Sequence, residues 1–231
     1  METRSVAIDG PSGAGKSTLA RMAARRLGII YADTGALYRS VGLYALRRGI
    51  SSRDARGVAA LLPEIEIEMS YDDTGCQRTH LRGEDVTDEI RAPEASLYAS
   101  DVSAIPDVRA FLLQTQRDMA ARRDVIMDGR DIGTVVLPNA GVKVFLTARP
   151  EIRARRRCDE LTAAGRDVTY EDVLRDINKR DTNDSSRAAA PLRVAADAIV
   201  FDTSELDLEE SFSGLLDIIN ERLYGENDAA V

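Results

Sequence analysis

Residues 6–17 read VAIDGPSGAGKS, a short apolar run followed by a glycine-rich turn that ends in lysine and serine. The turn, residues 10–17, fits the pattern G-x-x-x-x-G-K-[ST], which binds phosphate groups when it joins a strand to a helix. The context agrees, because residues 6–8 predict a buried strand and residues 19–27 repeat apolar side chains at helical spacing before Gly28. We therefore expect a P-loop here.

The P-loop predicts the nucleotide site. Its backbone N–H groups can surround the β- and γ-phosphates, Lys16 adds a positive charge, and the Ser17 hydroxyl can bind Mg²⁺ directly. A dinucleotide motif fits less well, because Thr18 stands where its third glycine should be. We expect ATP with Mg²⁺ as the ligand, bound by Gly10, Pro11, Ser12, Gly13, Ala14, Gly15, Lys16, Ser17 and Thr18.

Further apolar runs and the helical patterns between them predict the fold class. The runs are bounded by turn residues and cover residues 29–32, 125–127, 142–146 and 198–201. Pro93 and Pro106 suit the first turns of helices that continue to residues 102 and 122. This alternation is typical of an α/β protein. We expect a single domain over residues 1–231, with a doubly wound five-stranded parallel sheet and helices on both faces.

One stretch departs from the parallel pattern. Residues 64–71 alternate strictly between polar and apolar side chains, residues 72–75 favour a turn, and residues 76–82 form a second run before Gly83. This predicts a half-exposed antiparallel hairpin. We expect it to belong to a small insert, residues 63–104, that also contains a helix.

Composition argues against several classes of protein. The chain of 231 residues has a formal charge of −8, two cysteines and one histidine, so we expect neither a disulfide framework nor a zinc site. An acidic chain is poorly suited to nucleic acid. No apolar run approaches the roughly 18 residues of a membrane span or resembles a signal peptide, so we expect a cytoplasmic protein without a membrane partner. Residues 225–231 have the composition of a disordered tail.

Of the 31 basic residues, 28 are arginine. Codon bias can explain this excess. A second explanation is that many of the arginines bind phosphate or carboxylate groups through the planar guanidinium fork. Composition alone leaves both explanations open.

The P-loop leaves two classes to compare. A GTPase switch would use residues 72–75 as D-x-x-G and residues 178–181 as N-K-x-D. Both strings lie in the wrong context, because the first is a hairpin tip and the second lies within the helical pattern of residues 170–177. A phosphotransferase explains more residues, although a small acceptor such as AMP, UMP or shikimate remains an alternative.

The strand ends supply groups for catalysis and for a second substrate. Asp128 and Arg130 follow the strand at residues 125–127, at the edge where open α/β sheets bind ligands. We expect Asp128 to hold Mg²⁺ through water and Arg130 to neutralise a phosphate. Thr34 and Arg39 follow the second strand and can bind another anion.

A basic helix is predicted after the fourth strand. Arg149, Arg153, Arg156 and Arg157 recur at three- and four-residue spacing, so several guanidiniums share one side. A solvated face is one interpretation; we favour contact with a triphosphate, with residues 153–168 forming a short lid. The residues to which we assign catalytic roles are Lys16, Asp128, Arg130, Arg153 and Arg157.

Several segments in order resemble the bacterial cytidylate kinases. They are residues 8–16, 33–39, 83–86, 128–136 and 187–192, and the resemblance covers residues 4–222. It implies phosphoryl transfer from ATP to CMP or dCMP by a monomer whose insert binds the monophosphate. The CMP-binding residues that it implies are Thr34, Tyr38, Arg39, Ser100, Arg109, Arg130, Asp131, Arg180, Asp184 and Arg187. Leu137, where Phe is frequent, and Ser17, where Gly can occur, are minor departures.

The implied base-binding groups suit cytosine. Cytosine presents an amino donor beside two acceptors. A carboxylate, a guanidinium and a hydroxyl complement this edge, and they are the side-chain groups of Asp131, Arg109 and Ser100. Uracil would place an acceptor opposite Asp131. In the alternative interpretation, Asp131 is only a structural partner of Arg130.

Overall fold

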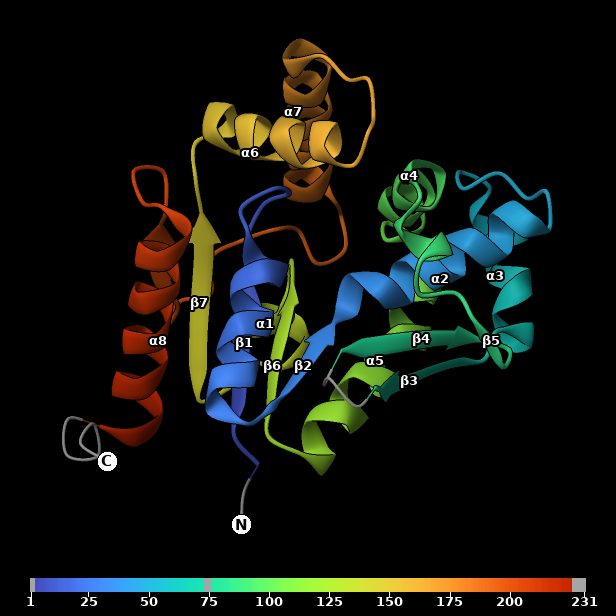
Figure 1. Ribbon diagram of the computed structural model, residues 1–231. Coiled ribbons are helices and arrows are strands. Elements are labelled where there is room, and N and C mark those ends of the chain that lie inside the picture. The colour runs from blue at the N-terminus through green and yellow to red at the C-terminus, as the bar shows by residue number, and fades with distance from the viewer. Residues whose placement is uncertain (1–2, 73–75, 226–231) are drawn as a thin grey trace.

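The computed structural model describes residues 3–72 and 76–225. Its centre is a five-stranded sheet in the order β2-β6-β1-β7-β8, with every neighbouring pair parallel (Figure 1). The strands are β1 (Ser5–Asp9), β2 (Ile30–Asp33), β6 (Val125–Gly129), β7 (Val142–Thr147) and β8 (Ile199–Asp202). The predicted fold class is confirmed, and the five predicted strands agree with the observed ones to within about two residues.

Helices cover both faces of this sheet because its strands are apolar on both sides. On one face Ile8 packs with residues of α1 (Lys16–Leu27) and α8 (Leu208–Tyr224). On the other face Ala7 and Met127 pack with residues of α5 (Pro106–Arg122) and of a single π-turn, η3 (Ile132–Val136). Alternate residues of β1 thus face opposite layers, as expected for a central parallel strand.

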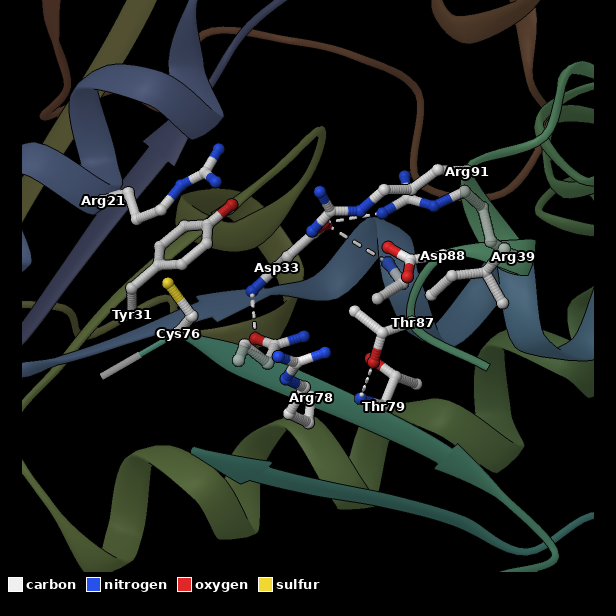
Figure 2. A pocket seen from close by; sticks show the side chains of 13 residues that line it. Arg21, Tyr31, Asp33, Arg39, Cys76, Arg78, Thr79, Thr87, Asp88 and Arg91 are labelled. Carbon is white, nitrogen blue, oxygen red and sulfur yellow. Dashed lines mark hydrogen bonds and ion pairs between the residues drawn. The ribbon is translucent and has the colours of Figure 1, made fainter. Parts of the chain in front are cut away.

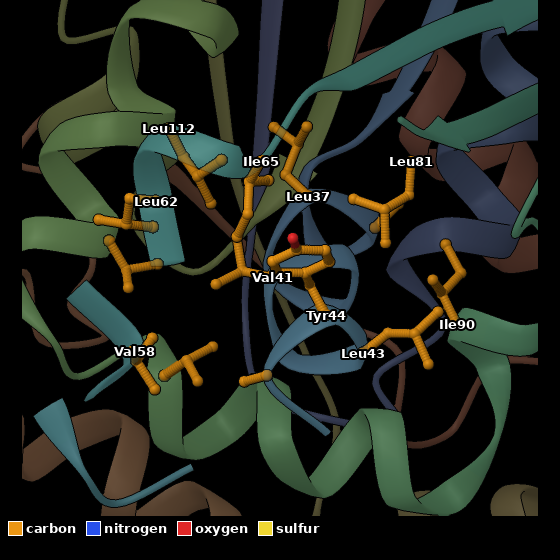
Figure 3. Close-up of a cluster of buried hydrophobic side chains, with 14 of the residues drawn as sticks. Leu37, Val41, Leu43, Tyr44, Val58, Leu62, Ile65, Leu81, Ile90 and Leu112 are labelled. Atoms are coloured by element: carbon orange, nitrogen blue, oxygen red, sulfur yellow. The ribbon is translucent and has the colours of Figure 1, made fainter. Parts of the chain in front are cut away.

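A second hydrophobic core lies beside the sheet (Figure 3). It joins α2 (Thr34–Arg47), α3 (Ala55–Leu61), α4 (Pro93–Val102), two short 3₁₀ turns, η1 (Leu62–Glu64) and η2 (Glu89–Arg91), and α5. The small antiparallel sheet of β3 (Ile67–Tyr71), β4 (Gln77–Leu81) and β5 (Glu84–Asp85) adds residues of β3 and β4 to this core, whereas the two residues of β5 are exposed. Leu37, Leu81 and Leu112 are at most 2 % exposed in this core. The predicted helices after Pro93 and Pro106 are confirmed.

The predicted hairpin is present, but its first strand is shorter than the alternation suggested. Residues 62–64 form η1, and the strand begins only at Ile67. The reason is that Pro63 suits a helical first turn and that the Tyr44 hydroxyl donates to Glu64 Oε2 at 2.7 Å, which ties this carboxylate to α2. The third strand, β5, was not predicted. Residues 73–75 of the predicted turn lie outside the described residues.

The segment after β7 forms two packed helices, α6 (Pro150–Ala163) and α7 (Tyr170–Ser186). The N-K-x-D string at residues 178–181 lies within α7, which agrees with its rejection as a guanine-binding motif. The predicted lid, residues 153–168, spans most of α6 and the connection to α7; its motion remains a prediction. No helix within the described ranges is both long and apolar enough to cross a bilayer. Of the predicted disordered tail, residues 226–231 lie outside the described part of the chain.

Candidate functional site

A cavity of about 980 Å³ lies at the carboxyl ends of β2 and β6, beside the P-loop. It brings together most of the residues predicted for the site. The predicted residues that line it are Ser12, Gly13, Ala14, Gly15, Lys16, Ser17, Thr18, Thr34, Tyr38, Arg39, Ser100, Arg109, Asp128, Arg130, Asp131, Arg157, Arg180, Asp184 and Arg187. Gly10, Pro11 and Arg153 do not line it.

The P-loop conformation depends on glycine. Gly10 has a φ of +150°, and a Cβ there would lie 1.9 Å from the Leu146 carbonyl oxygen, so no other residue fits. At the other end of the loop, Lys16 Nζ donates to the Pro11 carbonyl at 2.7 Å. Lys16 is only 5 % exposed. Burial, with a smaller contribution from the Arg130 guanidinium, lowers the pKa of Lys16 to about 7.

Asp128 lies at the junction of the P-loop and the sheet. Its Oδ2 accepts from Ser17 Oγ and its Oδ1 from the Tyr31 hydroxyl, each at 2.8 Å. Burial, and then the nearby Asp33 carboxylate, raises the pKa of Asp128. Tyr31 was not predicted, because it is part of the apolar run that forms β2 and its hydroxyl gives no signal in that pattern.

Arg39 is held in place by a carboxylate from the preceding strand. Its terminal nitrogen donates to Asp33 Oδ2 at 2.6 Å, and Asp33 also caps α2 by accepting from the Ala36 N–H at 3.1 Å. Arg39 Nε is buried without a hydrogen-bond partner in the described structure. Thr34, beside them, donates its hydroxyl to the Asp128 carbonyl at 2.8 Å. These contacts fix α2 against the sheet and leave one donor of Arg39 unused.

Asp131 and Arg109 form a buried ion pair at the cavity wall. Their side chains are 6 % and 11 % exposed, and the Arg109 guanidinium lies 5.7 Å from the centre of the Tyr38 ring. Burial raises the pKa of Asp131, although Arg109 opposes the shift. The ion-pair partner of Asp131 is Arg109 and not Arg130, which the alternative interpretation named, because Arg130 Nε donates to Asp184 Oδ2 at 2.7 Å.

Asp184 on α7 binds two guanidiniums. One oxygen accepts from Arg130 and the other from Arg187, both at 2.7 Å. Arg187 Nε is buried without a partner in the described structure. Arg180, also on the cavity wall, has no carboxylate within 4.0 Å among the described residues, and burial lowers its pKa. This part of the cavity therefore offers positive groups that are not fully neutralised by the protein.

The basic helix α6 is less uniform than its sequence suggested. Arg153 is 3 % exposed and donates to the Ser12 carbonyl at 2.9 Å and to Asp181 at 2.6 Å, so it supports the P-loop from behind. Arg156 donates to the Thr203 carbonyl at 2.6 Å. Arg157 lines the cavity beside Glu160. In this structure protein oxygens occupy the donors of Arg153. Its direct contact with a triphosphate stays a prediction.

Several lining residues were missed. Arg21 and Arg91 face the main cavity and also a pocket of about 200 Å³ beside it, which they share with Asp33 and Arg39 (Figure 2). At the other end, the cavity reaches residues 206–211, at the start of α8. No motif marks these positions. Arg21 lies on α1 one turn after Ser17, whereas Arg91 and residues 206–211 reach the site only through the packing of the insert and of α8.

Asp9 was also missed. It is 5 % exposed, and burial raises its pKa to about 6. The sequence did offer a signal for a role of Asp9, because it is a lone carboxylate at the end of an apolar strand. Such a group, once buried, needs hydrogen-bond donors from elsewhere in the chain.

Comparison with known proteins identifies relatives over nearly the whole chain. The family model described as cytidylate kinase matches residues 6–221. A cytidylate kinase from Caldicellulosiruptor bescii is 51% identical over 218 residues, 94% of this chain and 96% of the relative. One from Mycobacterium leprae is 48% identical with the same coverage. The fold also resembles an uncharacterized protein from Eubacterium ventriosum, with a TM-score of 0.51, 12% identity, and coverage of 96% of this chain and 100% of that one.

Proposed function

The chain belongs to the cytidylate kinase family, and we propose that it transfers the terminal phosphoryl group of ATP to CMP or dCMP, forming ADP and CDP or dCDP. The observation that carries this proposal is the buried Asp131–Arg109 pair, which lies on the same cavity as the P-loop. The Asp131–Arg109 pair fits the edge of a cytosine, and the P-loop fits a triphosphate.

The base is selected by the polarity of its edge. An ionised Asp131 can accept from the cytosine amino group, while Arg109 and the Ser100 hydroxyl can donate to its ring acceptors. Uracil presents an oxygen where cytosine presents the amino group. That oxygen would meet the carboxylate, and both acceptors would lack a donor in a buried site.

The phosphates are bound by groups at the strand ends. Lys16 and the P-loop N–H groups suit the β- and γ-phosphates of ATP, while Arg39 and Arg130 suit the CMP phosphate. Arg180, which has no ion-pair partner in the described structure, lies on the same wall and can share the charge. The chemical purpose of these cations is to bring two polyanions together despite their repulsion.

Transfer needs no general base, because the attacking group is already an anionic oxygen of the CMP phosphate. That oxygen forms a bond to the γ-phosphorus while the bond to the oxygen that bridges the β- and γ-phosphates breaks, and ADP leaves. Negative charge spreads over the equatorial oxygens, where Lys16 and the arginines stabilise it. Closure of the lid at residues 153–168 would exclude water, which would otherwise accept the phosphoryl group.

The donor set near the P-loop fits Mg²⁺. Ser17 Oγ and Asp128 Oδ2 are hard oxygen ligands that lie 2.8 Å apart, and Mg²⁺ prefers one or two such groups together with phosphate oxygens and water. Ser17 would bind the ion directly and Asp128 through water. When bound, Mg²⁺ supplies charge neutralisation across the β- and γ-phosphates.

A steady-state assay with ATP and Mg²⁺ tests the proposal, with CMP, dCMP, UMP, AMP, GMP and shikimate as acceptors. The highest kcat/KM is expected for CMP or dCMP. If AMP, UMP or shikimate is turned over preferentially, that compound and not CMP is the acceptor. Guanine-nucleotide exchange without acceptor-dependent turnover would favour a GTPase switch. A monomeric chain and a cytoplasmic location belong to the same proposal; sedimentation velocity tests the first and fractionation of cells the second.

A further inference from the structure

Asp9 connects two segments of the site that are far apart in sequence. It is the last residue of β1 and directly precedes Gly10 of the P-loop. Its Oδ1 accepts from the Ile132 N–H and its Oδ2 from the Gly133 N–H, both at 2.7 Å. These two N–H groups belong to the first residues of η3, immediately after Asp131.

The start of η3 is unusual because its own capping residue does not cap it. Asp131 is at the N-cap position, with φ −146° and ψ 26°, but its side chain makes no capping hydrogen bond. An aspartate at this position normally accepts from the N–H groups of the first turn, including that of Gly133. Here Asp9 takes those donors, and the Asp131 carboxylate pairs with Arg109 instead.

A carboxylate is the group that this contact requires. Both oxygens of Asp9 face N–H donors, so each must accept. An asparagine could satisfy only one donor and would turn its own N–H₂ group toward the other. Because Asp9 is buried, water cannot replace the missing acceptor without opening the junction.

We propose that Asp9 is a positioning residue for recognition of the base: by binding the first N–H groups of η3, it keeps the carboxylate of Asp131 turned toward the cavity. Without Asp9, the unpaired N–H of Gly133 would compete for Asp131, whose carboxylate would leave Arg109 and the base. The inference rests on the proposed function, since it takes Asp131 as the group that contacts cytosine.

The test compares Asp9→Asn, Asp131→Asn and the double variant. The matched control is Asp124→Asn, since Asp124 Oδ1 also accepts a backbone N–H, that of Arg4 at 2.7 Å, but Asp124 does not line the cavity. At pH 8, kcat and KM are measured for CMP, UMP and ATP. Asp9→Asn should lower the preference for CMP over UMP about tenfold, mainly through KM for CMP, the scale expected when a buried polar group loses its partner. KM for ATP should stay within about twofold, because the side chain of Asp9 binds η3 and Asp9→Asn removes no P-loop group. Asp124→Asn should leave the preference unchanged, because Asp124 binds Arg4 and does not line the cavity.

The double variant provides the decisive comparison. If Asp9 acts through Asp131, Asp9→Asn should cause no further loss of preference once Asp131 is asparagine. An equal fall for CMP and UMP, a matching rise in KM for ATP, or additive losses in the double variant would overturn the inference. Should Asp9→Asn fail to fold, Asp9→Glu enters the same comparison; its longer side chain should push η3 outward and lower the preference, and an unchanged preference would count against the proposal.

The wild-type enzyme separates the two hypotheses. If it does not prefer CMP or dCMP, the proposed function fails whatever the variants do. If it does prefer them while Asp9→Asn keeps that preference, only the positioning role of Asp9 fails.

Discussion

Replacing Asp131 with asparagine is the most direct test of base selection. In the structure both members of the Asp131–Arg109 pair are nearly buried, with side chains 6 % and 11 % exposed, so water cannot substitute for a lost contact. Asparagine keeps the shape of the side chain but removes the charge, which deprives the cytosine amino group of a strong acceptor. Leaving a buried polar group unpaired costs about 1 to 3 kcal/mol, which predicts a fall of roughly 5- to 150-fold in kcat/KM for CMP.

UMP should respond differently to Asp131→Asn. The asparagine amide can donate to the uracil oxygen that repels a carboxylate, so kcat/KM for UMP should fall less than for CMP or rise. The unpaired Arg109 charge affects the free enzyme before either substrate binds, so it cannot by itself change the ratio between them. The ratio of the two kcat/KM values therefore reports on contact with the base.

The assay measures initial rates with CMP and UMP at saturating ATP, together with KM for ATP and the thermal unfolding of each variant. With UMP turnover unchanged, we expect the CMP to UMP ratio of kcat/KM to fall by the same roughly 5- to 150-fold, and KM for ATP to stay unchanged. Equal losses for both substrates would refute this reasoning. Asp131 would then organise the site through Arg109 without touching the base.

Three further predictions concern other parts of the site. Lys16→Ala should lower kcat about 100-fold or more with the fold intact by circular dichroism, because Lys16 stabilises charge that develops during transfer; retained activity would contradict the role of the P-loop. Asp128→Asn should raise the Mg²⁺ concentration needed for half-maximal rate in a titration at fixed ATP, since it weakens a ligand to the hydrated ion; an unchanged titration would exclude that role. Burial raises the pKa of folded Asp9 to about 6 from an unfolded value near 3.8, so folding favours its protonated form. The free energy of unfolding of the wild type, relative to that of Asp9→Asn, should therefore fall by up to about 3 kcal/mol as pH rises from 4 to 7. Urea unfolding at each pH measures both values, and parallel plots of the two against pH would contradict the prediction.

Local patterns in the sequence were sufficient to predict the sheet and the P-loop. Residues 6–17 encode a strand, a glycine-dependent turn and a helix start within one short segment, and each part depends on its neighbours in sequence. The first strand of the hairpin was predicted too long because a non-local contact prevailed. Glu64 fits the alternating pattern, yet it binds the Tyr44 hydroxyl, 20 residues earlier, and remains outside the sheet.

The partners of the buried charged groups could not be predicted, because they join residues far apart in sequence. Asp9 binds Gly133 across 124 positions and Tyr31 binds Asp128 across 97. Arg153 shows the consequence most clearly. Its spacing on α6 predicted one guanidinium among several on a shared face, but in the structure Arg153 is buried and pairs with the half-buried Asp181 of α7.

The pairing pattern in the cavity helps to explain why the chain uses arginine so heavily. Arg39 binds Asp33 through one terminal nitrogen while its Nε has no partner in the described structure. Arg187 likewise binds Asp184 and retains an unpaired Nε. A planar guanidinium can bind a carboxylate with one part of its fork and still present donors to a second group, whereas an ammonium acts as a point charge. A lysine carries all its donors on one nitrogen, so at these two positions it could not present a second donor where Nε lies. The geometry therefore accounts for arginine at Arg39 and Arg187, whereas codon bias can account for arginine on the surface.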